Sequence, residues 1–584
     1  MATPGLRCAA FLLLALLSSP ALAGDVSVKL DSGAGFSVKN STGATERLRV
    51  DEATGNVSRN GALFVHTTGA NNLFVGPGAG NPSTTGTGYN TAFGQNALSA
   101  NTTGYFNTGV GFVALGSNTM GSSNSAFGLS ALRYNTTGFR NSAVGHNALR
   151  LNTTGYGNSA VGFQALFSNT TGTFNSAVGY LALRSNTTAC CNSAFGSGAL
   201  KANTTGIYNS AFGTDALVSN TTGGNNSAFG LGSLRFNTTG TYNSAFGRDS
   251  LLHNTIGQGN AAFGGLALLS NTTGSDNVAV GYRALRSSTT ANANSAVGFD
   301  SLRYTTTGAG NSAFGSSSLR ANTTGASNSA FGSFALAANT TGYQSTAFGR
   351  YALASNTTGY RNTAVGTYSL RNDSTGSSNA AFGKDALLNN TIGSRNIAIG
   401  NGAGSSVQTG NDNILIANAG NISASGQIRI GTTGTQTLAL IAGISGATSA
   451  SGVGVLVNAA GVLGTTTSSA RFKQDVRDIG DASDVLMKLR PVTFRYREDV
   501  VGAEDSKITE YGLIAEEVET VAPELVAPDL DGKPYSVKYH ELPALLLNEL
   551  QKTEKTVEAD ERVIAEQREV IASLAARIEK LEAR

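Results

Sequence analysis

Basic side chains recur at one position of the sequence between about residue 101 and residue 400. Such side chains attract polyanions, for example acidic polysaccharide, lipopolysaccharide or DNA, but they also keep an exposed face soluble. We expect no aromatic residues interleaved with this column, which favours the solubility interpretation and predicts no specific nucleic-acid site. Each member follows Ala-Leu or Ser-Leu, and the members lie at multiples of 17 residues from one another: Arg133, Arg150, Arg184, Lys201, Arg235, Arg286, Arg303, Arg320 and Arg371.

Cysteine and histidine show no spacing that would hold a metal ion. The adjacent pair Cys190-Cys191 can close only a strained ring, so we interpret the two thiols as buried or incidental rather than as a redox or metal site. The four histidines, His66, His146, His253 and His540, are scattered. We predict no metal and no cofactor.

A serine and a lysine lie five residues apart where the composition changes abruptly, at Ser468 and Lys473. A serine hydroxyl becomes a useful nucleophile when a nearby base accepts its proton, and a desolvated lysine can be that base. The spacing by itself favours a linker serine and a solvated lysine.

Paired carboxylates do not recur: residues 101–400 contain six Asp and no Glu, which argues against a polysaccharide-processing enzyme.

A block of 17 residues, roughly N-T-T-G-x-x-N-S-A-(F/V)-G-x-x-A-L-(R/x)-x, organises the chain from about residue 101 to residue 400. An apolar residue returns every 17 positions from Val110 to Ile399 without a slipped residue. A fixed period of this kind predicts a solenoid. Short runs bounded by Asn, Thr and Gly fit two short strands per block, one at N-S-A-(F/V)-G and one ending in Ala-Leu.

The core of such a coil is thin. We expect each block to bury one Phe or Val, one Leu and two Ala, which is little apolar area against the entropy of ordering. Association of several chains would bury more surface and protect strand edges, so a homo-oligomer is expected.

The repeat resembles the head repeats of trimeric autotransporter adhesins over about Leu73 to Asn413. The resemblance implies a trimeric parallel β-roll and says little about the ligand.

The N-terminus reads as a secretory signal over residues 1–23. Arg7 gives the first residues a positive charge, and the residues from Cys8 to Leu17 are apolar. The bond between Ala23 and Gly24 follows small residues, as a signal cleavage site does. We therefore expect an exported protein, extracellular or on the surface of a bacterium, with no membrane-spanning segment in the mature chain.

Charge is segregated along the chain. Residues 471–584 hold 25 acidic and 17 basic residues, whereas the preceding residues hold 12 acidic and 23 basic. Several short motifs follow the junction: residues 491–496 (PVTFRY), 511–518 (YGLIAEEV), 523–526 (PELV) and 537–542 (VKYHEL).

This set of motifs resembles the intramolecular chaperone domain of phage endosialidases and tail spikes, the S74 peptidase family, over residues 468–584. The resemblance implies a domain that trimerises, assists folding of the upstream β-fibre and then cuts itself free. The family motif S-D-x-R-x-K places the nucleophile at Ser468 and its basic partner at Lys473, with cleavage between Thr467 and Ser468. Ser469 stands where the motif has Asp.

The C-terminal residues read as a coiled coil from about residue 545. Leu550, Val557, Ile564, Ile571 and Ile578 lie seven apart, with Leu546, Leu574 and Leu581 on the companion position. Ile or Val with Leu leans toward dimers in simple peptides, and the family resemblance implies a trimer.

The prediction is a mostly β chain in five parts: signal 1–23, β segment 24–72, repeat solenoid 73–410, β-rich neck 411–467, and a small α+β chaperone domain 468–584 ending in the coiled coil. We expect an adhesin-like homotrimeric fibre matured by single-turnover Ser/Lys self-cleavage, with no activity on external substrates. Its partners would be itself and a glycan or other polyanionic surface. The alternative is a structural surface or tail-fibre-like appendage whose chaperone domain stays uncleaved.

Overall fold

The computed structural model describes residues 28–31, 35–40, 42, 46–51, 53–85, 88–444, 452–458, 460–529 and 531–583. The predicted signal 1–23 and its cleavage site at Ala23 and Gly24 lie outside these residues. The chain forms two compact units, residues 1–439 and 440–584, which divide inside the predicted neck. No helix in the described part of the chain combines the length and the apolar character needed to cross a membrane.

The first unit opens with an antiparallel meander of five strands. They are β1 Val28–Asp31, β2 Gly35–Lys39, β3 Glu46–Val50, β4 Val57–Arg59 and β5 Ala62–His66. Strand β5 pairs antiparallel with β6, the first strand of a long parallel ladder. The buried His66 ring joins the two parts, because its Nε2 lies 2.7 Å from the Ala79 carbonyl and its centroid 5.0 Å from that of Phe74.

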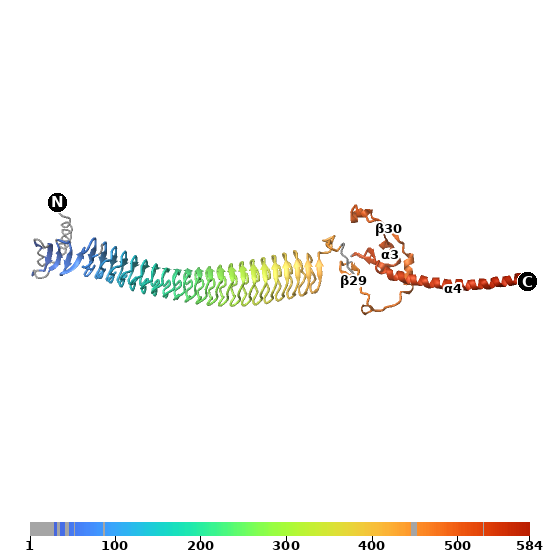
Figure 1. Cartoon of the computed structure of the whole chain (residues 1–584), viewed down its shortest axis with the longest axis horizontal. Helices are drawn as coiled ribbons and strands as arrows, with labels where there is room; N and C mark the ends of the chain where they lie inside the picture. The colour runs from blue at the N-terminus through green and yellow to red at the C-terminus, as the bar shows by residue number, and fades with distance from the viewer. Residues whose placement is uncertain are drawn as a thin grey trace. The chain divides into compact units, whose positions relative to one another are not determined.

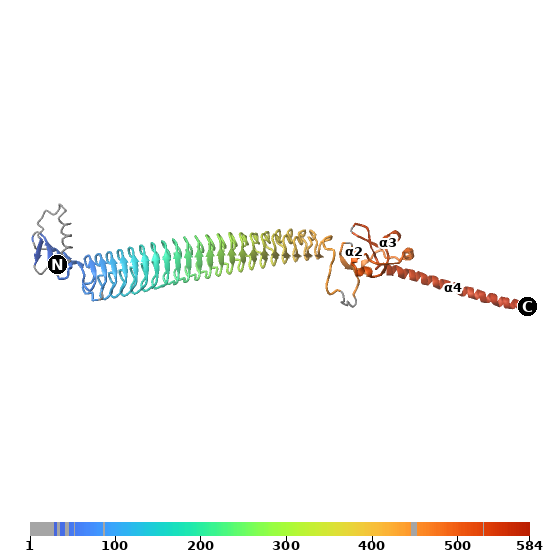
Figure 2. The same ribbon diagram turned by 90° about the horizontal axis from the view of Figure 1, so that it is seen from above.

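The parallel ladder confirms the predicted solenoid, which Figures 1 and 2 show as a row of closely stacked coils. From β7 to β25 each strand pairs with the residues 17 positions further on, for example Ser125 with Ser142, and β26 pairs with the residues 14 positions further on. The ladder continues through Ile430. Its strands are β6 Leu73–Val75, β7 Thr91–Phe93, β8 Thr108–Val110, β9 Ser125–Phe127, β10 Ser142–Val144, β11 Ser159–Val161, β12 Ser176–Val178, β13 Ser193–Phe195, β14 Ser210–Phe212, β15 Ser227–Phe229, β16 Ser244–Phe246, β17 Ala261–Phe263, β18 Val278–Val280, β19 Ser295–Val297, β20 Ser312–Phe314, β21 Ser329–Phe331, β22 Thr346–Phe348, β23 Thr363–Val365, β24 Ala380–Phe382, β25 Ile397–Ile399, β26 Ile414–Ile416 and β27 Ile428–Ile430.

Each coil holds one strand, so the expectation of a second strand at Ala-Leu was wrong. The Ala-Leu run is a turn in which Leu adopts a left-handed conformation, for example Leu132 at φ 51°. Non-glycine residues rarely adopt this region because Cβ crowds the backbone. Hydrogen bonds between coils hold the turn instead: the Leu132 N–H donates to the Ala148 carbonyl at 3.0 Å.

Alanine and leucine fill the core of the coil. In β9 the middle residue Ala126 is fully buried, as are Ala131 and Leu132 of the same coil. Side chains alternate faces along a strand, so Phe127 points to the other face and is 43% exposed. The expectation that the Phe/Val column lies in the core was therefore wrong.

Buried asparagines run through the solenoid as two ladders, one from each Asn of the block. Asn135 Nδ2 donates to Asn118 Oδ1 at 2.7 Å and to the Gly138 carbonyl at 2.9 Å. Asn141 Nδ2 donates to Asn124 Oδ1 at 3.2 Å. A buried amide costs free energy unless its donors and acceptors are paired, and coil-to-coil repetition provides these partners.

The second unit is a small α+β domain followed by a long helix. Its elements are β28 Val455–Val457, β29 Leu463–Thr465, η1 Ala470–Phe472, η2 Gly480–Lys488, β30 Val492–Phe494, α2 Glu498–Val501, η3 Asp505–Lys507, β31 Glu510–Gly512, α3 Ala515–Val521, η4 Pro523–Leu525, β32 Val526–Pro528, β33 Pro534–Val537 and α4 Leu542–Glu582. Three antiparallel pairs form, β28 with β29, β30 with β31 and β32 with β33.

Candidate functional site

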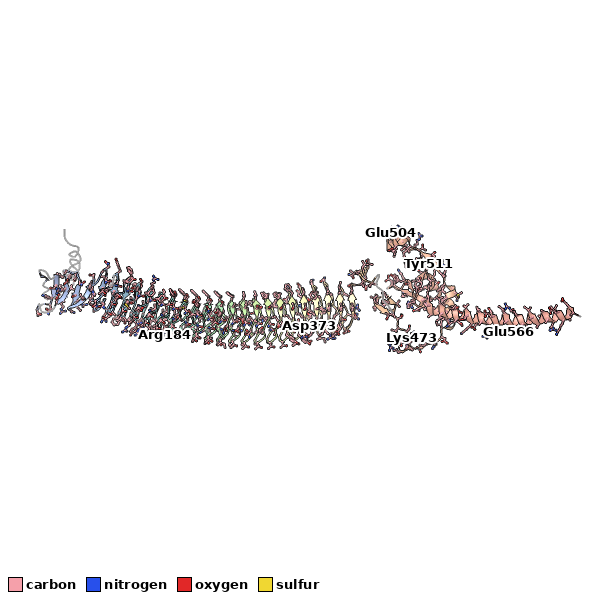
Figure 3. All side chains as sticks on the ribbon, in the orientation of Figure 1. Arg184, Asp373, Lys473, Glu504, Tyr511 and Glu566 are labelled. Carbon is pink, nitrogen blue, oxygen red and sulfur yellow. The ribbon has the colours of Figure 1, made fainter. Side chains whose placement is uncertain are left out.

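The predicted processing junction lies on exposed chain between β29 and η2. Thr467, Ser468 and Lys473 are all exposed, and the short η1 helix separates the serine from the lysine. The Lys473 backbone N–H closes η1 by donating to the Ala470 carbonyl at 3.1 Å. Figure 3 labels Lys473 on this extended segment.

The single chain does not assemble a Ser/Lys dyad at this junction. Among the described residues, neither the Ser468 hydroxyl nor the Lys473 ammonium makes a hydrogen bond or ion pair. A lysine acts as a general base only in its neutral form, and burial favours that form because it penalises the charge. In the described part of the chain, Lys473 has no such burial.

The motifs that follow the junction do come together. Residues 491–496 contain β30, which pairs with β31 at the start of the 511–518 motif. The Tyr539 hydroxyl accepts a hydrogen bond from the Leu513 N–H at 2.9 Å, and the Lys538 N–H donates to the Leu525 carbonyl at 2.8 Å. Segments far apart in sequence thus form one small domain.

Five buried residues form the core of this domain. Val518 and Ala522 lie at α3, Leu525 and Val526 follow at η4 and β32, and Val537 ends β33. The alternating and helical spacing of these motifs places their apolar residues on one inner face.

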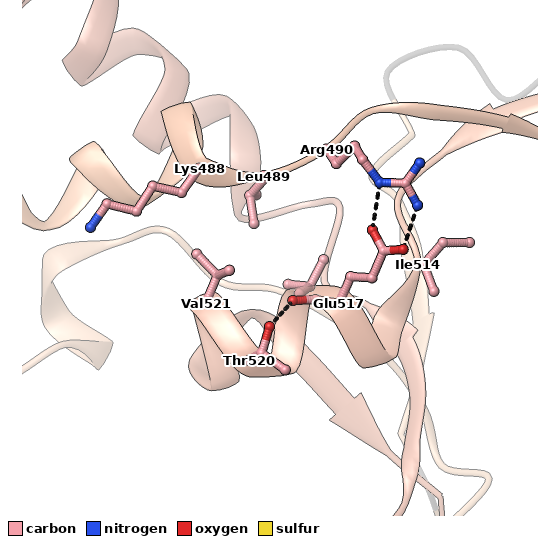
Figure 4. Close-up of a pocket in the computed structure, with 8 residues that line it drawn as sticks. Lys488, Leu489, Arg490, Ile514, Glu517, Thr520 and Val521 are labelled. Carbon is pink, nitrogen blue, oxygen red and sulfur yellow. Dashed lines mark hydrogen bonds and ion pairs between the residues drawn. The ribbon is translucent and has the colours of Figure 1, made fainter.

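An ion pair forms part of the lining of a pocket beside α3 (Figure 4). The Arg490 guanidinium binds the Glu517 carboxylate through two hydrogen bonds, of which the Nε–Oε2 bond is 3.0 Å. This pairing lowers the pKa of Glu517 and raises that of Arg490. The pocket is lined by Lys488, Leu489 and residues of α3, and the ion pair connects the end of η2 to α3.

Polar contacts connect η2 to helix α4. The buried Ser483 hydroxyl donates to Glu549, and Lys552 Nζ lies 2.6 Å from Asp484 and 2.9 Å from Glu549. Hydrogen bonds from Lys552 to these carboxylates raise its pKa to about 12. The Ser483 hydroxyl lowers the pKa of Glu549. These contacts orient the start of α4.

Helix α4 presents an apolar seam that its own chain does not cover. The helix has 41 residues, none of which is buried among those described. The seam positions are exposed: Leu546, Leu550, Val557, Ile564, Ile571, Leu574, Ile578 and Leu581. Figure 3 labels Glu566 on this helix, between seam positions.

The solenoid carries a second uncovered apolar surface, the Phe/Val column. Five rings from Phe195 to Phe263 stack on consecutive coils with centroids 4.7–4.9 Å apart and nearly parallel planes. Phe314, Phe331 and Phe348 form another stack, with centroids 4.9 and 5.4 Å apart. The sequence did contain a signal for this exposure: the column mixes Phe, Val and Ile on adjacent coils, while the core Leu column is constant from Leu98 to Leu387.

The surroundings of the basic column differ from the prediction that no aromatic residues are interleaved with it. Aromatic rings do lie beside it, for example Tyr134 between Arg133 and Arg150, and Tyr304 between Arg303 and Arg320. Some members are neutralised by acids. Arg235 lies 3.2 Å from Asp215, and Arg303 lies 3.1 Å from the buried Asp300.

One buried acid interrupts the first asparagine ladder. Asp373 occupies the position of the ladder Asn and is fully buried, and its Oδ1 accepts from Asn390 Nδ2 at 2.8 Å. Its Oδ2 has no partner among the described residues, and neither has Oδ1 of Asn356 one coil earlier. Burial raises the pKa of Asp373 to about 8. Sequence reasoning missed this group, although an Asp within the Asn column was the available signal.

The cysteines and histidines form no metal site in the described part of the chain. Cys190 and Cys191 are free thiols that are partly exposed. The hydrogen bond with Cys190 raises the pKa of Cys191 to about 11, so this thiol is a weak nucleophile at neutral pH.

Comparison with protein families finds one similarity, which lies within the second unit. Residues 468–527 match the Peptidase_S74 model, described as chaperone of endosialidase, and the match begins at Ser468. No curated protein and no solved structure matched the chain. The chain therefore combines a long parallel β-solenoid with a later segment, residues 468–527, that is similar to the S74 chaperone family.

Proposed function

We propose that this protein is an exported homotrimeric fibre, adhesin-like in its repeats, whose C-terminal domain assembles the trimer and then releases itself. The observation that carries the proposal is the apolar seam of α4, which no other described residue buries, in a helix that begins shortly after the S74-like residues 468–527. Apolar residues at heptad spacing become stable only when neighbouring helices cover them.

The exposed Phe/Val column supports the same assembly. Members of the column range from half-buried to exposed, with Phe127 and Phe348 43% and 56% exposed, so apolar surface remains along the solenoid. Covering this surface with two further copies would stabilise the fibre by roughly 25 cal/mol for each Å² of apolar surface buried. Export rests on the N-terminal pattern of residues 1–23.

Self-cleavage would proceed through an ester. The Ser468 hydroxyl adds to the Thr467 carbonyl carbon, the Thr467–Ser468 C–N bond breaks, and the nitrogen gains a proton to become an amine. Lys473 serves as the base that takes the hydroxyl proton, and water then hydrolyses the ester. Because Lys473 is exposed in one chain, assembly must provide its desolvation, and cleavage should therefore follow trimerisation.

A denaturing gel with N-terminal sequencing tests this proposal. The wild-type chain should yield a fragment that begins at Ser468, and Ser468→Ala should abolish it. The neighbouring substitution Ser469→Ala is the matched control and should still cleave. Lys473→Arg keeps the charge but removes the base, so it should remain intact.

A second function is favoured by two observations at the junction. Ser469 replaces the Asp of the family motif, and Lys473 is exposed. Both fit a structural appendage that keeps its chaperone domain. Recovery of full-length wild-type trimers after prolonged incubation would support this alternative and contradict self-cleavage.

A further inference from the structure

One stretch of the solenoid is free of acidic residues. No Asp or Glu occurs between Glu52 and Asp215. Within this stretch Arg133, Arg150, Arg184 and Lys201 occupy the basic column, so no carboxylate on the same coils can neutralise them. At about 4.8 Å per coil, these four cations span about 19 Å.

Two aromatic rings lie between these arginines. The Tyr134 ring centroid is 5.0 Å from the Arg133 guanidinium and 5.5 Å from that of Arg150. The Phe167 ring is 5.6 Å from both Arg150 and Arg184. We call this set the basic ladder; its members are Arg133, Tyr134, Arg150, Phe167, Arg184 and Lys201.

The rings hold the arginines in place without neutralising them. A guanidinium stacked on a ring loses little further rotamer freedom on binding an anion, and its N–H edge stays available for a bidentate contact. Arg184 is fixed further, because its Nε donates to Gln164 Oε1 at 2.9 Å. In the described part of the chain, Arg133, Arg150 and Lys201 have no acceptor or acid within bonding distance.

Some arginines further along the solenoid are paired with acidic residues, unlike those of the basic ladder. Asp215 pairs with Arg235, and Asp300 pairs with both Arg283 and Arg303. These ion pairs neutralise part of the arginine charge within the chain. The basic ladder is therefore a long uncompensated cationic surface, whereas the later column is partly neutralised.

We infer that the basic ladder binds an extended anionic polysaccharide, whose carboxylate or sulfate groups pair with successive cations along the solenoid. Charge complementarity provides the attraction. Because the coils repeat, one polysaccharide molecule can contact several cations at once. Single-stranded nucleic acid is disfavoured because it needs open aromatic faces for its bases, and guanidinium groups lie over these rings. This inference rests on the proposed fibre role for its biological setting only.

Binding of the full chain to immobilised heparin and polygalacturonate tests the inference, with unmodified dextran and single-stranded DNA as comparison surfaces. The quadruple variant Arg133→Gln, Arg150→Gln, Arg184→Gln, Lys201→Gln should bind at least about tenfold more weakly at low salt. The control variant removes four other exposed solenoid charges: Arg235→Gln, Arg248→Gln, Arg361→Gln and Arg395→Gln. It should retain most of the binding.

A second variant separates the ladder from simple charge attraction. Tyr134→Ala with Phe167→Ala leaves the net charge unchanged, and it should weaken binding several-fold if the rings preorganise the arginines. Thermal melts verify that each variant is folded. Equal losses in the ladder and control variants, tighter binding to DNA than to either glycan, or no binding to any anionic surface would each overturn the inference.

Glycan binding is also measured on Ser468→Ala chains, and light scattering measures their oligomeric state. Cleavage and trimer formation are thus scored separately from glycan binding, so either proposal can fail without the other.

Discussion

At the residue scale, Asp373 is the group whose protonation matters most to the solenoid. A ladder Asn would donate from Nδ2 to the preceding Asn and to its own turn glycine, as Asn390 does to Gly393 at 2.9 Å. Asp373 Oδ2 can make one of these contacts, and only when it carries a proton. Burial raises its pKa to about 8, so the neutral acid is the favoured form at neutral pH.

Replacing Asp373 with Asn should stabilise the fibre, and more so as pH rises. The unfolded carboxyl ionises near pH 3.8 while the folded one ionises near pH 8, so between these values the folded chain holds a proton that the unfolded chain has lost. Wild-type stability should therefore be greatest in acid, fall as pH rises through this window, and level off above it.

Asp373→Asn should remove this slope and add on the order of 2–4 kcal/mol near pH 7. Thermal melts at several pH values, with hydrogen exchange of the adjacent coils, measure the effect. Asp385→Asn, at a partly exposed carboxylate paired with Lys384 at 3.4 Å, is the control and should change little. Identical pH slopes in wild type and Asp373→Asn would contradict the assignment.

At the scale of the elements, one glycine in each coil allows the strand to turn. Gly230 follows β15 at φ 134°, and a Cβ there would lie 2.7 Å from the carbonyl carbon and oxygen of Gly247 in the next coil. That conflict involves backbone on both sides, so neither coil can yield without breaking the ladder.

Gly230→Ala should destabilise the neighbouring coils by about 2–4 kcal/mol, because it adds both strain and overlap. Gly232→Ala is the matched control. Its φ of 67° is close to that of Asp215 and Asp249 at equivalent positions. Its Cβ would approach the movable Asp249 carboxylate closely and would make an ordinary van der Waals contact with Leu252 at 3.6 Å. Hydrogen exchange should therefore increase around residue 230 in the first variant alone. Equal protection from hydrogen exchange in the two variants would show that neighbouring coils can separate at little cost in free energy.

At the scale of the whole molecule, the proposed trimer and its cleavage depend on the seam of α4. Ile571 and Ala572 are neighbours on this helix, and Ile571 is 64% exposed in the single chain. A monomer would tolerate Asp at either position, with a helix-propensity cost of about 0.5 kcal/mol. A coiled coil would tolerate it only at Ala572, outside the heptad seam.

Ile571→Asp should therefore abolish trimers and, with them, cleavage at Ser468, while Ala572→Asp should leave both intact. Light scattering measures the trimer, and the denaturing gel measures the fragment. Monomeric Ile571→Asp chains that still cleave would separate the two functions and show that one chain desolvates Lys473 unaided.

Much of the architecture follows from periodicity alone. A repeat of 17 residues with no slip requires equivalent positions to stack, and this predicted the parallel solenoid. The motifs after residue 468 likewise predicted the S74-type domain, and the heptads predicted the long helix. Local patterns of this kind are sufficient because each element is stabilised mainly by its nearest neighbours.

Only the tertiary structure decided which face of each coil is inside. A period shows that Val110, Phe127 and their equivalents share one environment, but not whether that environment is core or solvent. The narrow coil accepts Ala126 and Leu132, so strand alternation turns the larger Phe127 outward. The same stacking brings Tyr134 between two arginines and buries Asp373 among amides, because each contact joins residues one coil apart that no local pattern links.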